Sequence, residues 1–236
     1  MKKLDAAMGG GLFAGKAYGL QARKKIGKTV LLGTISYNLN LTGVRHLWIA
    51  AEMNDRELEQ RHLARALDYN AVEFLKGEDL CLAEQVAEYN KTAPNNIVYA
   101  NAPGLTTKDL DKVLDEAVRK YDIKGFVLDY LQLVRPLSPM TRADHLEYVA
   151  QWVAAATRKH GIWAMVAAQL NQHDNTRGGE GMLLAFDMVF SLRRPKYSAN
   201  AWLEMMETRY TMYQHVGSEK KPGLKLEQKG PYFSET

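Results

Sequence analysis

The sequence predicts an α/β fold with a mostly parallel central sheet, helices on both faces, and antiparallel strands added at the C-terminal end. Apolar runs of strand length alternate with helical periodicity until about residue 170, a pattern typical of strands buried on both faces of a parallel sheet. The later apolar runs follow each other through short connections, which favour antiparallel pairing. The chain has no internal repeat or low-complexity segment. We therefore expect one domain over residues 1–236.

The predicted strands are short apolar runs bounded by turn residues. They cover residues 18–21, 47–51, 97–100, 125–129, 163–168, 188–192, 202–208 and 223–227. The predicted helices have apolar residues three or four positions apart, and the second begins with a capping signature, Asn54 followed three residues later by Glu57. They cover residues 30–41, 54–67, 82–92, 107–121 and 145–159. Three glycines at 9–11 predict a turn, and the polar segments 134–143 and 170–182 predict loops.

The composition fits a globular protein, with 46% hydrophobic and 25% charged residues. Cys81 is the single cysteine, which excludes an intramolecular disulfide and a cysteine-rich zinc site and fits a reducing, cytoplasmic setting. The net charge of +4 is compatible with an anionic partner, and equally with an ordinary soluble protein. We see neither a signal peptide nor a run of ~20 apolar residues, so we expect no membrane partner.

A phosphate-binding loop is predicted between the first strand and the first helix. It consists of Ala22, Arg23, Lys24, Lys25, Ile26, Gly27, Lys28 and Thr29. Backbone N–H groups of such a loop surround phosphate oxygens, the lysine reaches the β- and γ-phosphates, and the hydroxyl coordinates Mg²⁺. The usual pattern begins with glycine, whereas this one begins with Ala22. The alternative is a chance Gly-Lys-Thr in a basic loop, but the strand-to-helix context favours a nucleoside triphosphate site.

Three polar side chains stand at the ends of predicted parallel strands, where ligand crevices form. Asp129 could hold Mg²⁺ through water, or it could cap a turn. Glu52 could orient or deprotonate an attacking water, or it could be a surface carboxylate that opens a loop. Gln169 could bond the γ-phosphate, or it could belong to a polar turn. His173, in the loop that follows, has no partner at metal-ligand spacing, so a phosphate contact is the better interpretation of that loop.

In this order, the segments resemble the RecA-type ATPase core of the DnaB-like replicative hexameric helicases, which have phage and plasmid relatives. The family's P-loop commonly reads Ala-Arg-x-x-x-Gly-Lys-Thr, which accounts for Ala22. The other matches are Leu4-Asp5 before a glycine pair, Glu52-Met53, Gln60-Arg61, Asp129-Tyr130-Leu131-Gln132-Leu133 and Ala168-Gln169-Leu170-Asn171. The run 129–133 is the most specific of them, and the resemblance covers nearly the whole chain.

The resemblance implies ATP and Mg²⁺ as ligands, Glu52 as the catalytic base and Gln169 as the phosphate sensor. It places Arg61 with the nucleotide-binding residues. Segments 134–143 and 171–181 look like the two loops that face the central channel and hold single-stranded DNA. The expected DNA contacts are Arg135, Arg142, Arg177 and Gly178.

The sequence departs from the family pattern in three places. The late Lys-x-Arg, which acts on the neighbouring subunit's nucleotide, is here Glu207-Thr208-Arg209, so the arginine finger is present without the lysine. Lys24 and Lys25 make the P-loop more basic than usual. No N-terminal domain or linker helix precedes Leu4, so we expect an excised domain or a natural minimal protein whose ring is weak alone.

The expected function is an ATP-hydrolysing DNA helicase motor that forms a hexameric ring, translocates on single-stranded DNA and works with a replication primase or loader. Two alternatives remain open. One is a RecA-like recombinase or clock-type ATPase that forms filaments or rings without unwinding. The other is a nucleotide-binding DNA-interaction module without turnover, which the missing lysine and the missing N-terminal region favour.

Overall fold

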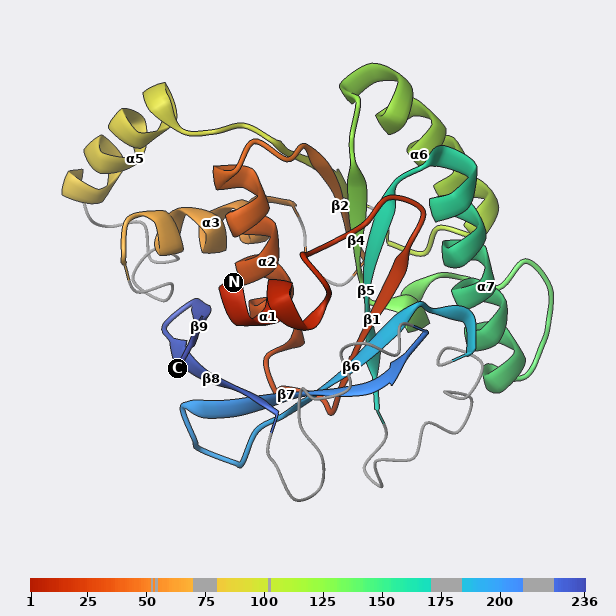
Figure 1. The fold of residues 1–236 in the computed structure, drawn as a ribbon. Helices are drawn as coiled ribbons and strands as arrows, with labels where there is room; N and C mark the ends of the chain where they lie inside the picture. The colour runs from red at the N-terminus through yellow and green to blue at the C-terminus, as the bar shows by residue number, and fades with distance from the viewer. Residues whose placement is uncertain (52, 54, 70–79, 102, 171–183, 210–222) are drawn as a thin grey trace.

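The computed structural model describes residues 1–51, 53, 55–69, 80–101, 103–170, 184–209 and 223–236. Within them, nine strands form one sheet in the order β3-β2-β4-β5-β1-β6-β7-β8-β9 (Figure 1). The strands are β1 (Ala17–Ala22), β2 (His46–Ala50), β3 (Ile97–Asn101), β4 (Gly125–Asp129), β5 (Trp163–Gln169), β6 (Met188–Arg193), β7 (Asn200–Thr208), β8 (Leu224–Lys229) and β9 (Tyr232–Glu235).

The sheet is parallel from β3 to β6 and antiparallel from β6 to β9, which confirms the predicted fold class. The central parallel strands β1, β2, β4 and β5 are buried on both faces, as their continuous apolar runs predict. Alternate residues of one strand enter different cores: Ile49 packs into one apolar cluster and Trp48 into the other. Each face of the sheet therefore needs its own layer of helices.

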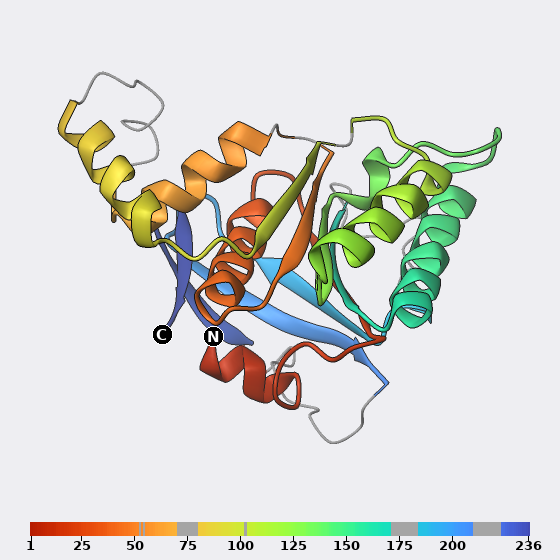
Figure 2. The same cartoon turned by 90° about the horizontal axis from the view of Figure 1, so that it is seen from above.

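Helices cover both faces, as Figure 2 shows. On one side lie α6 (Thr107–Tyr121) and α7 (Arg142–His160), which pack on the sheet through residues such as Leu114 and Val153. On the other side lie α1 (Lys2–Ala7), α2 (Lys28–Leu41) and α3 (Asp55–Ala66), through residues such as Leu4, Leu32 and Leu58. Helix α5 (Leu80–Thr92) follows α3 in the chain, and the short 3-10 helix η1 (Leu131–Leu133) follows β4.

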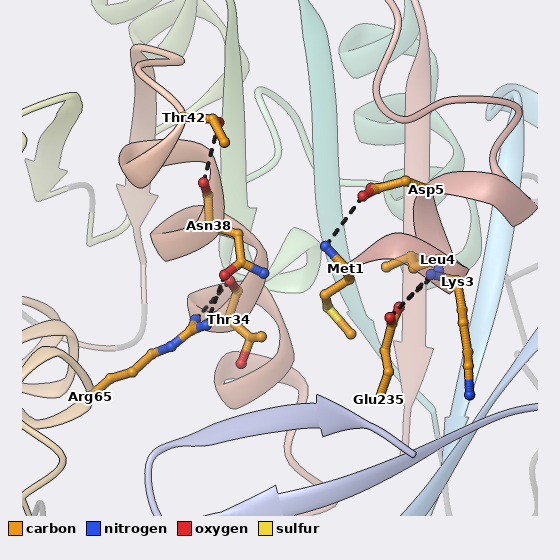
Figure 3. Close-up of polar contacts among 9 residues, drawn as sticks. All are labelled: Met1, Lys3, Leu4, Asp5, Thr34, Asn38, Thr42, Arg65 and Glu235. Atoms are coloured by element: carbon orange, nitrogen blue, oxygen red, sulfur yellow. Dashed lines mark hydrogen bonds and ion pairs between the residues drawn. The ribbon is translucent and has the colours of Figure 1, made fainter.

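Some elements differ from the sequence-based prediction. Helix α7 begins at Arg142, three residues before the predicted start, because the Thr141 hydroxyl accepts a hydrogen bond from the Asp144 N–H and caps the helix there. Helix α1, η1 and strand β9 were not predicted. Glu235 explains α1: its carboxylate accepts hydrogen bonds from the N–H groups of Lys3 at 3.1 Å and Leu4 at 2.9 Å (Figure 3).

Among the described residues, none of the helices has both the length and the apolar character that crossing a membrane requires.

Two glycines of the packed elements should respond to alanine in opposite directions. A Cβ on Gly125 would lie 2.0 Å from Cδ2 of Trp163, its partner across β4 and β5. We expect Gly125→Ala to lower the free energy of unfolding by about 1–3 kcal/mol, as overpacking does. Gly33 is the matched control, because it lies inside α2 and its added Cβ would meet His62 Nε2 at an ordinary 3.8 Å. Gly33→Ala should raise stability by about 0.5–1 kcal/mol through helix propensity. Urea unfolding of both variants checks the pair, and a Gly125→Ala protein as stable as the parent contradicts the packing argument.

Candidate nucleotide-binding site

The predicted P-loop lies where the sequence places it, between the end of β1 at Ala22 and the start of α2 at Lys28. Gly27, the residue before α2, has a φ of 115°, in the region that favours glycine. A Cβ there would also lie 3.1 Å from the ring of Phe233 on β9. The loop therefore turns tightly against the last strand and directs the N-terminus of α2 toward its concave side.

Lys28 is buried to 8% exposure, which is rare for lysine and requires polar partners. Its Nζ donates to the carbonyl oxygens of Ala22 at 3.4 Å and Arg23 at 3.3 Å. The loop's own backbone thus fixes the ammonium group at the end of β1. A fixed cation beside the helix N-terminus can bind a polyphosphate without reorganising the loop.

A cleft of about 670 Å³ opens over the P-loop, within the size range of small-molecule sites. Its walls come from the P-loop, from α3, from the end of β5 and from the turn between β8 and β9. The lining residues are Lys24, Lys25, Gly27, Lys28, Thr29, Val30, Met53, Glu57, Gln60, Arg61, Gln169, Arg194, Gln228, Gly230 and Pro231. Lysine and arginine outnumber the one carboxylate of this lining, so the cleft suits an anionic ligand.

The cleft brings together most of the residues predicted to bind nucleotide. Lys24, Lys25, Gly27, Lys28, Thr29 and Arg61 line it directly. Three other predicted members do not. Ala22 is buried at the end of β1, the Arg23 carbonyl accepts from Lys28, and Ile26 packs against the apolar cluster beneath α2.

The residues at the carboxyl ends of β4 and β5 lie at the same end of the sheet as the P-loop, which follows the carboxyl end of β1. Ala22 on β1 pairs with Gln169 on β5, and the N–H of Leu170 donates to the Ala22 carbonyl at 2.9 Å. Asp129 ends β4, on the far side of β5, and is 4% exposed. Two inter-strand spacings, or about 10 Å, therefore separate the Asp129 backbone from the P-loop strand. A hydrated ion between Asp129 and Thr29 can span such a gap.

Glu52 lies outside the described residues. The N–H of Ala51 donates to the Asp129 carbonyl at 3.2 Å, and Met53 lines the cleft.

Arg209 lies near the amino ends of the parallel strands, whereas the P-loop lies at their carboxyl ends. Thr208 pairs with Met188 on β6, and Met188 pairs with Tyr18 near the start of β1. From Tyr18 to Ala22 the strand rises about 13 Å. Arg209 donates through its guanidinium to the Leu184 carbonyl, and its N–H donates to the Asp187 carbonyl at 2.9 Å.

The predicted DNA-contacting residues are only partly described. Arg135 is exposed, and its N–H donates to the Leu105 carbonyl at 2.9 Å, which ties segment 134–141 to the start of α6. Arg142 is exposed in the first turn of α7. Arg177 and Gly178 lie outside the described residues.

Behind the cleft, α3 is fastened to α2 by Arg65. Its guanidinium donates to the Thr34 carbonyl and to the Asn38 side chain, each at 2.8 Å (Figure 3). His62, one turn earlier on α3, bonds the Tyr99 hydroxyl through Nδ1 at 2.7 Å. Burial lowers the pKa of His62 to about 3, so the ring is neutral near pH 7. These contacts hold the helix that carries Arg61 into the cleft.

Sequence reasoning missed the wall opposite α3. Arg194 follows the carboxyl end of β6, and its guanidinium donates to the Gln228 side chain. Gly230 and Pro231 form the turn between β8 and β9. The sequence could have indicated Arg194, because a basic residue that follows the carboxyl end of a buried strand is a candidate for the ligand site there. No such signal marks the turn, because β9 was not predicted.

The donor set fits Mg²⁺ held together with phosphate. Among the described residues, no three His, Cys, Asp or Glu side chains gather closely enough to hold a metal. An ion at Thr29 and Asp129 would take its remaining oxygen ligands from phosphate and water, as Mg²⁺ commonly does.

Two of the many solved structures that share the fold illustrate the likeness. One is described as an ATPase domain, with a TM-score of 0.84, 16% identity, and coverage of 100% of this chain and 89% of that one. The other is described as "The Structure Of A DnaB-Like Replicative Helicase And Its Interactions With Primase", with a TM-score of 0.82, 16% identity, and coverage of 99% of this chain and 60% of that one. This likeness, together with the P-loop, shows that the chain has a RecA-like P-loop ATPase fold. Among proteins with curated functions, no significant match to the sequence was found.

The profile of the family described as "DnaB-like helicase C terminal domain" matches residues 1–182. The chain belongs to this family of DnaB-like helicase domains.

Replacing Lys28 tests the cleft as a nucleotide site. We expect Lys28→Ala to weaken binding of a fluorescent ATP analogue by about tenfold to a hundredfold, because a charge-assisted contact to phosphate is lost. Lys91→Ala is the control, since Lys91 is exposed on α5 and pairs with Glu88. Unchanged affinity in Lys28→Ala would place the ligand elsewhere.

Proposed function

We propose that residues 1–236 form one RecA-like motor domain that hydrolyses ATP, translocates on single-stranded DNA and unwinds duplex DNA. The observation that carries the proposal is that the buried Lys28 and Asp129 and the half-buried Gln169 lie at the same end of the parallel strands, in a chain of the DnaB-like family. The unbroken sheet from β3 to β9 supports a single domain.

In this proposal, the residues around the cleft have different roles in ATP binding and hydrolysis. Lys28 and the backbone of residues 23–27 bind and orient the β- and γ-phosphates, and Arg61 and Arg194 add positive charge to the cleft walls. Glu52 accepts a proton from the attacking water or orients it. When bound, Mg²⁺ neutralises charge on the phosphates.

The position of Arg209 supports an oligomer with nucleotide sites between subunits. Arg209 is separated from its own P-loop by nearly the full length of β1, so it cannot act on the nucleotide of its own chain. In a head-to-tail ring, it would reach the neighbour's nucleotide and stabilise charge in the transition state, a role worth ~10³–10⁵ in rate in well-studied NTPases. A hexamer is the arrangement we propose by similarity to the family.

DNA contacts are proposed for Arg135, Arg142, Arg177 and Gly178. Arg135 is exposed, and segment 134–141 leads from the Asp129 strand into α7. Residues 171–181 directly follow the Gln169 strand. The two DNA segments thus follow strands that end at the site, one at the proposed metal residue Asp129 and one at the proposed phosphate sensor Gln169, which lets loss of the γ-phosphate change the grip on the DNA backbone. A replication primase or loader is the further partner, since one similar structure is described with its primase interactions.

Turnover and unwinding assays test the function together. We expect ATPase activity that single-stranded DNA stimulates, and unwinding of forked DNA. Glu52→Gln should abolish both and leave nucleotide affinity within about threefold, because it removes the base while keeping the side-chain size.

Other outcomes point elsewhere. Strand exchange without unwinding would indicate a recombinase-type protein. Absence of turnover with and without DNA would indicate a nucleotide-stabilised DNA-binding module. Turnover that survives Glu52→Gln would contradict the assignment of the base.

Mixing two inactive variants tests whether Arg209 acts between subunits. We expect Arg209→Ala and Glu52→Gln each to lack activity and a mixture of the two to recover part of it. The site of an Arg209→Ala subunit regains its arginine from a Glu52→Gln neighbour. Arg193→Ala is the control, because Arg193 is exposed and pairs with Glu204 on β7. A mixture as inactive as its components contradicts the shared site.

A further inference from the structure

The end of β5 extends beyond its neighbour β4. The last register pair between them joins Leu128 to Val166, and β4 stops at Asp129, whereas β5 continues to Gln169. The peptide groups at the end of β5 therefore face a side where the neighbouring strand has finished. Backbone groups left in such a position need other hydrogen-bond partners.

The side chain of Gln132 supplies these partners. Its Nε2 donates to the Gln169 carbonyl at 3.0 Å, and its Oε1 accepts from the Gln169 N–H at 3.1 Å. The amide thus bonds both the donor and the acceptor of one residue, as a backbone neighbour in an antiparallel pair would. On the other side of β5, Leu170 donates to Ala22 of the P-loop strand. The end of β5 is held from both sides.

Gln132 is itself firmly placed. It lies in η1 between the buried Leu131 and Val134, which are 1% and 4% exposed and pack into the apolar cluster under α7. The chain then reaches Arg135, whose N–H bonds Leu105. Gln132 therefore joins the beginning of segment 134–141 to the last residue of β5, close before segment 171–181.

We propose that Gln132 is a positioning residue for the phosphate sensor, and that it couples the first DNA-contacting segment to the nucleotide cleft. By fixing the Gln169 backbone level with Ala22, it sets where the Gln169 side chain stands in the cleft. A shift of segment 134–141 on DNA then moves Gln169, and a shift of Gln169 moves that segment. This inference rests on the proposed function of the site.

Variants of the full chain separate positioning from simple stability. Gln132→Ala loses both bonds. Gln132→Glu keeps the acceptor but cannot donate while ionised, and it regains the donor on protonation. Gln151→Ala is the control, because Gln151 is an exposed glutamine of α7 that bonds Glu147 on the same helix. Gln132 does not line the cleft, so affinity for a non-hydrolysable ATP analogue should stay within about threefold in all variants.

We expect DNA-stimulated kcat to fall about tenfold in Gln132→Ala and Gln132→Glu near pH 8. The ratio of the Gln132→Glu rate to the parent rate should rise as the pH falls from about 8.5 to 5.5, because the half-buried carboxyl facing a carbonyl oxygen has a raised pKa. Among the described residues, Asp129, Tyr130, Arg135, Arg142, Asp144 and His145 are charged or titratable groups on the segments that flank η1. They are common to all the proteins, so the ratio cancels their titration. A flat ratio would indicate a structural role and overturn the proposal.

Hydrogen exchange at the backbone N–H of Gln169 can be measured without ATP turnover. In the parent, the ATP analogue should slow this exchange, and Gln132→Ala should speed it and weaken the effect of the analogue. If the parent lacks turnover but shows this pattern, the proposed function fails and the positioning role stands. If Gln132→Ala leaves both exchange and kcat at the parent's values, the positioning role is wrong whatever the parent does.

Discussion

The nucleotide cleft depends on β1 and β5 ending level with each other. Their parallel pairing runs from Ala17 to Ala22 on one strand and from Ala164 to Gln169 on the other. Because side chains alternate along a strand, a slip of one residue would turn Gln169 toward the other face. The register is fixed by burial, since the paired strands contribute alternately to the two apolar clusters. The packing of apolar side chains therefore fixes where the polar side chain of Gln169 lies relative to the P-loop.

The two ends of each parallel strand serve different purposes. The carboxyl ends carry the P-loop, Asp129 and Gln169, and the amino ends lie beside the segment that carries Arg209. The two groups lie at opposite ends because β7 runs antiparallel to β6 and so brings the chain back to the level of the amino end of β1. The P-loop and Arg209 therefore lie at opposite ends of the strands of one sheet.

Local signals in the sequence were sufficient for strands β1 to β5, whereas β6, which was expected among the antiparallel strands, pairs in parallel with β1. The run Phe126–Leu128 is apolar throughout, and the Gly27-Lys28-Thr29 triplet follows a strand, so the strand, the loop and the edge could be predicted. The bonds of Gln132 could not, because they depend on how far β5 extends past β4. Strand β9 and helix α1 are four and six residues long, and each is stabilised by distant contacts, such as that between the Phe233 N–H and Thr34.

The packing of Phe233 against Gly27 has a consequence for synthesis on the ribosome. The P-loop is translated early, yet its strand pairs with β5 and β6, and its turn is covered by β9. These partners emerge late, and such distant pairings form slowly. The nascent chain therefore carries the phosphate-binding sequence before it has the walls to hold a ligand, and β9, which is translated after the other described strands, completes the cleft.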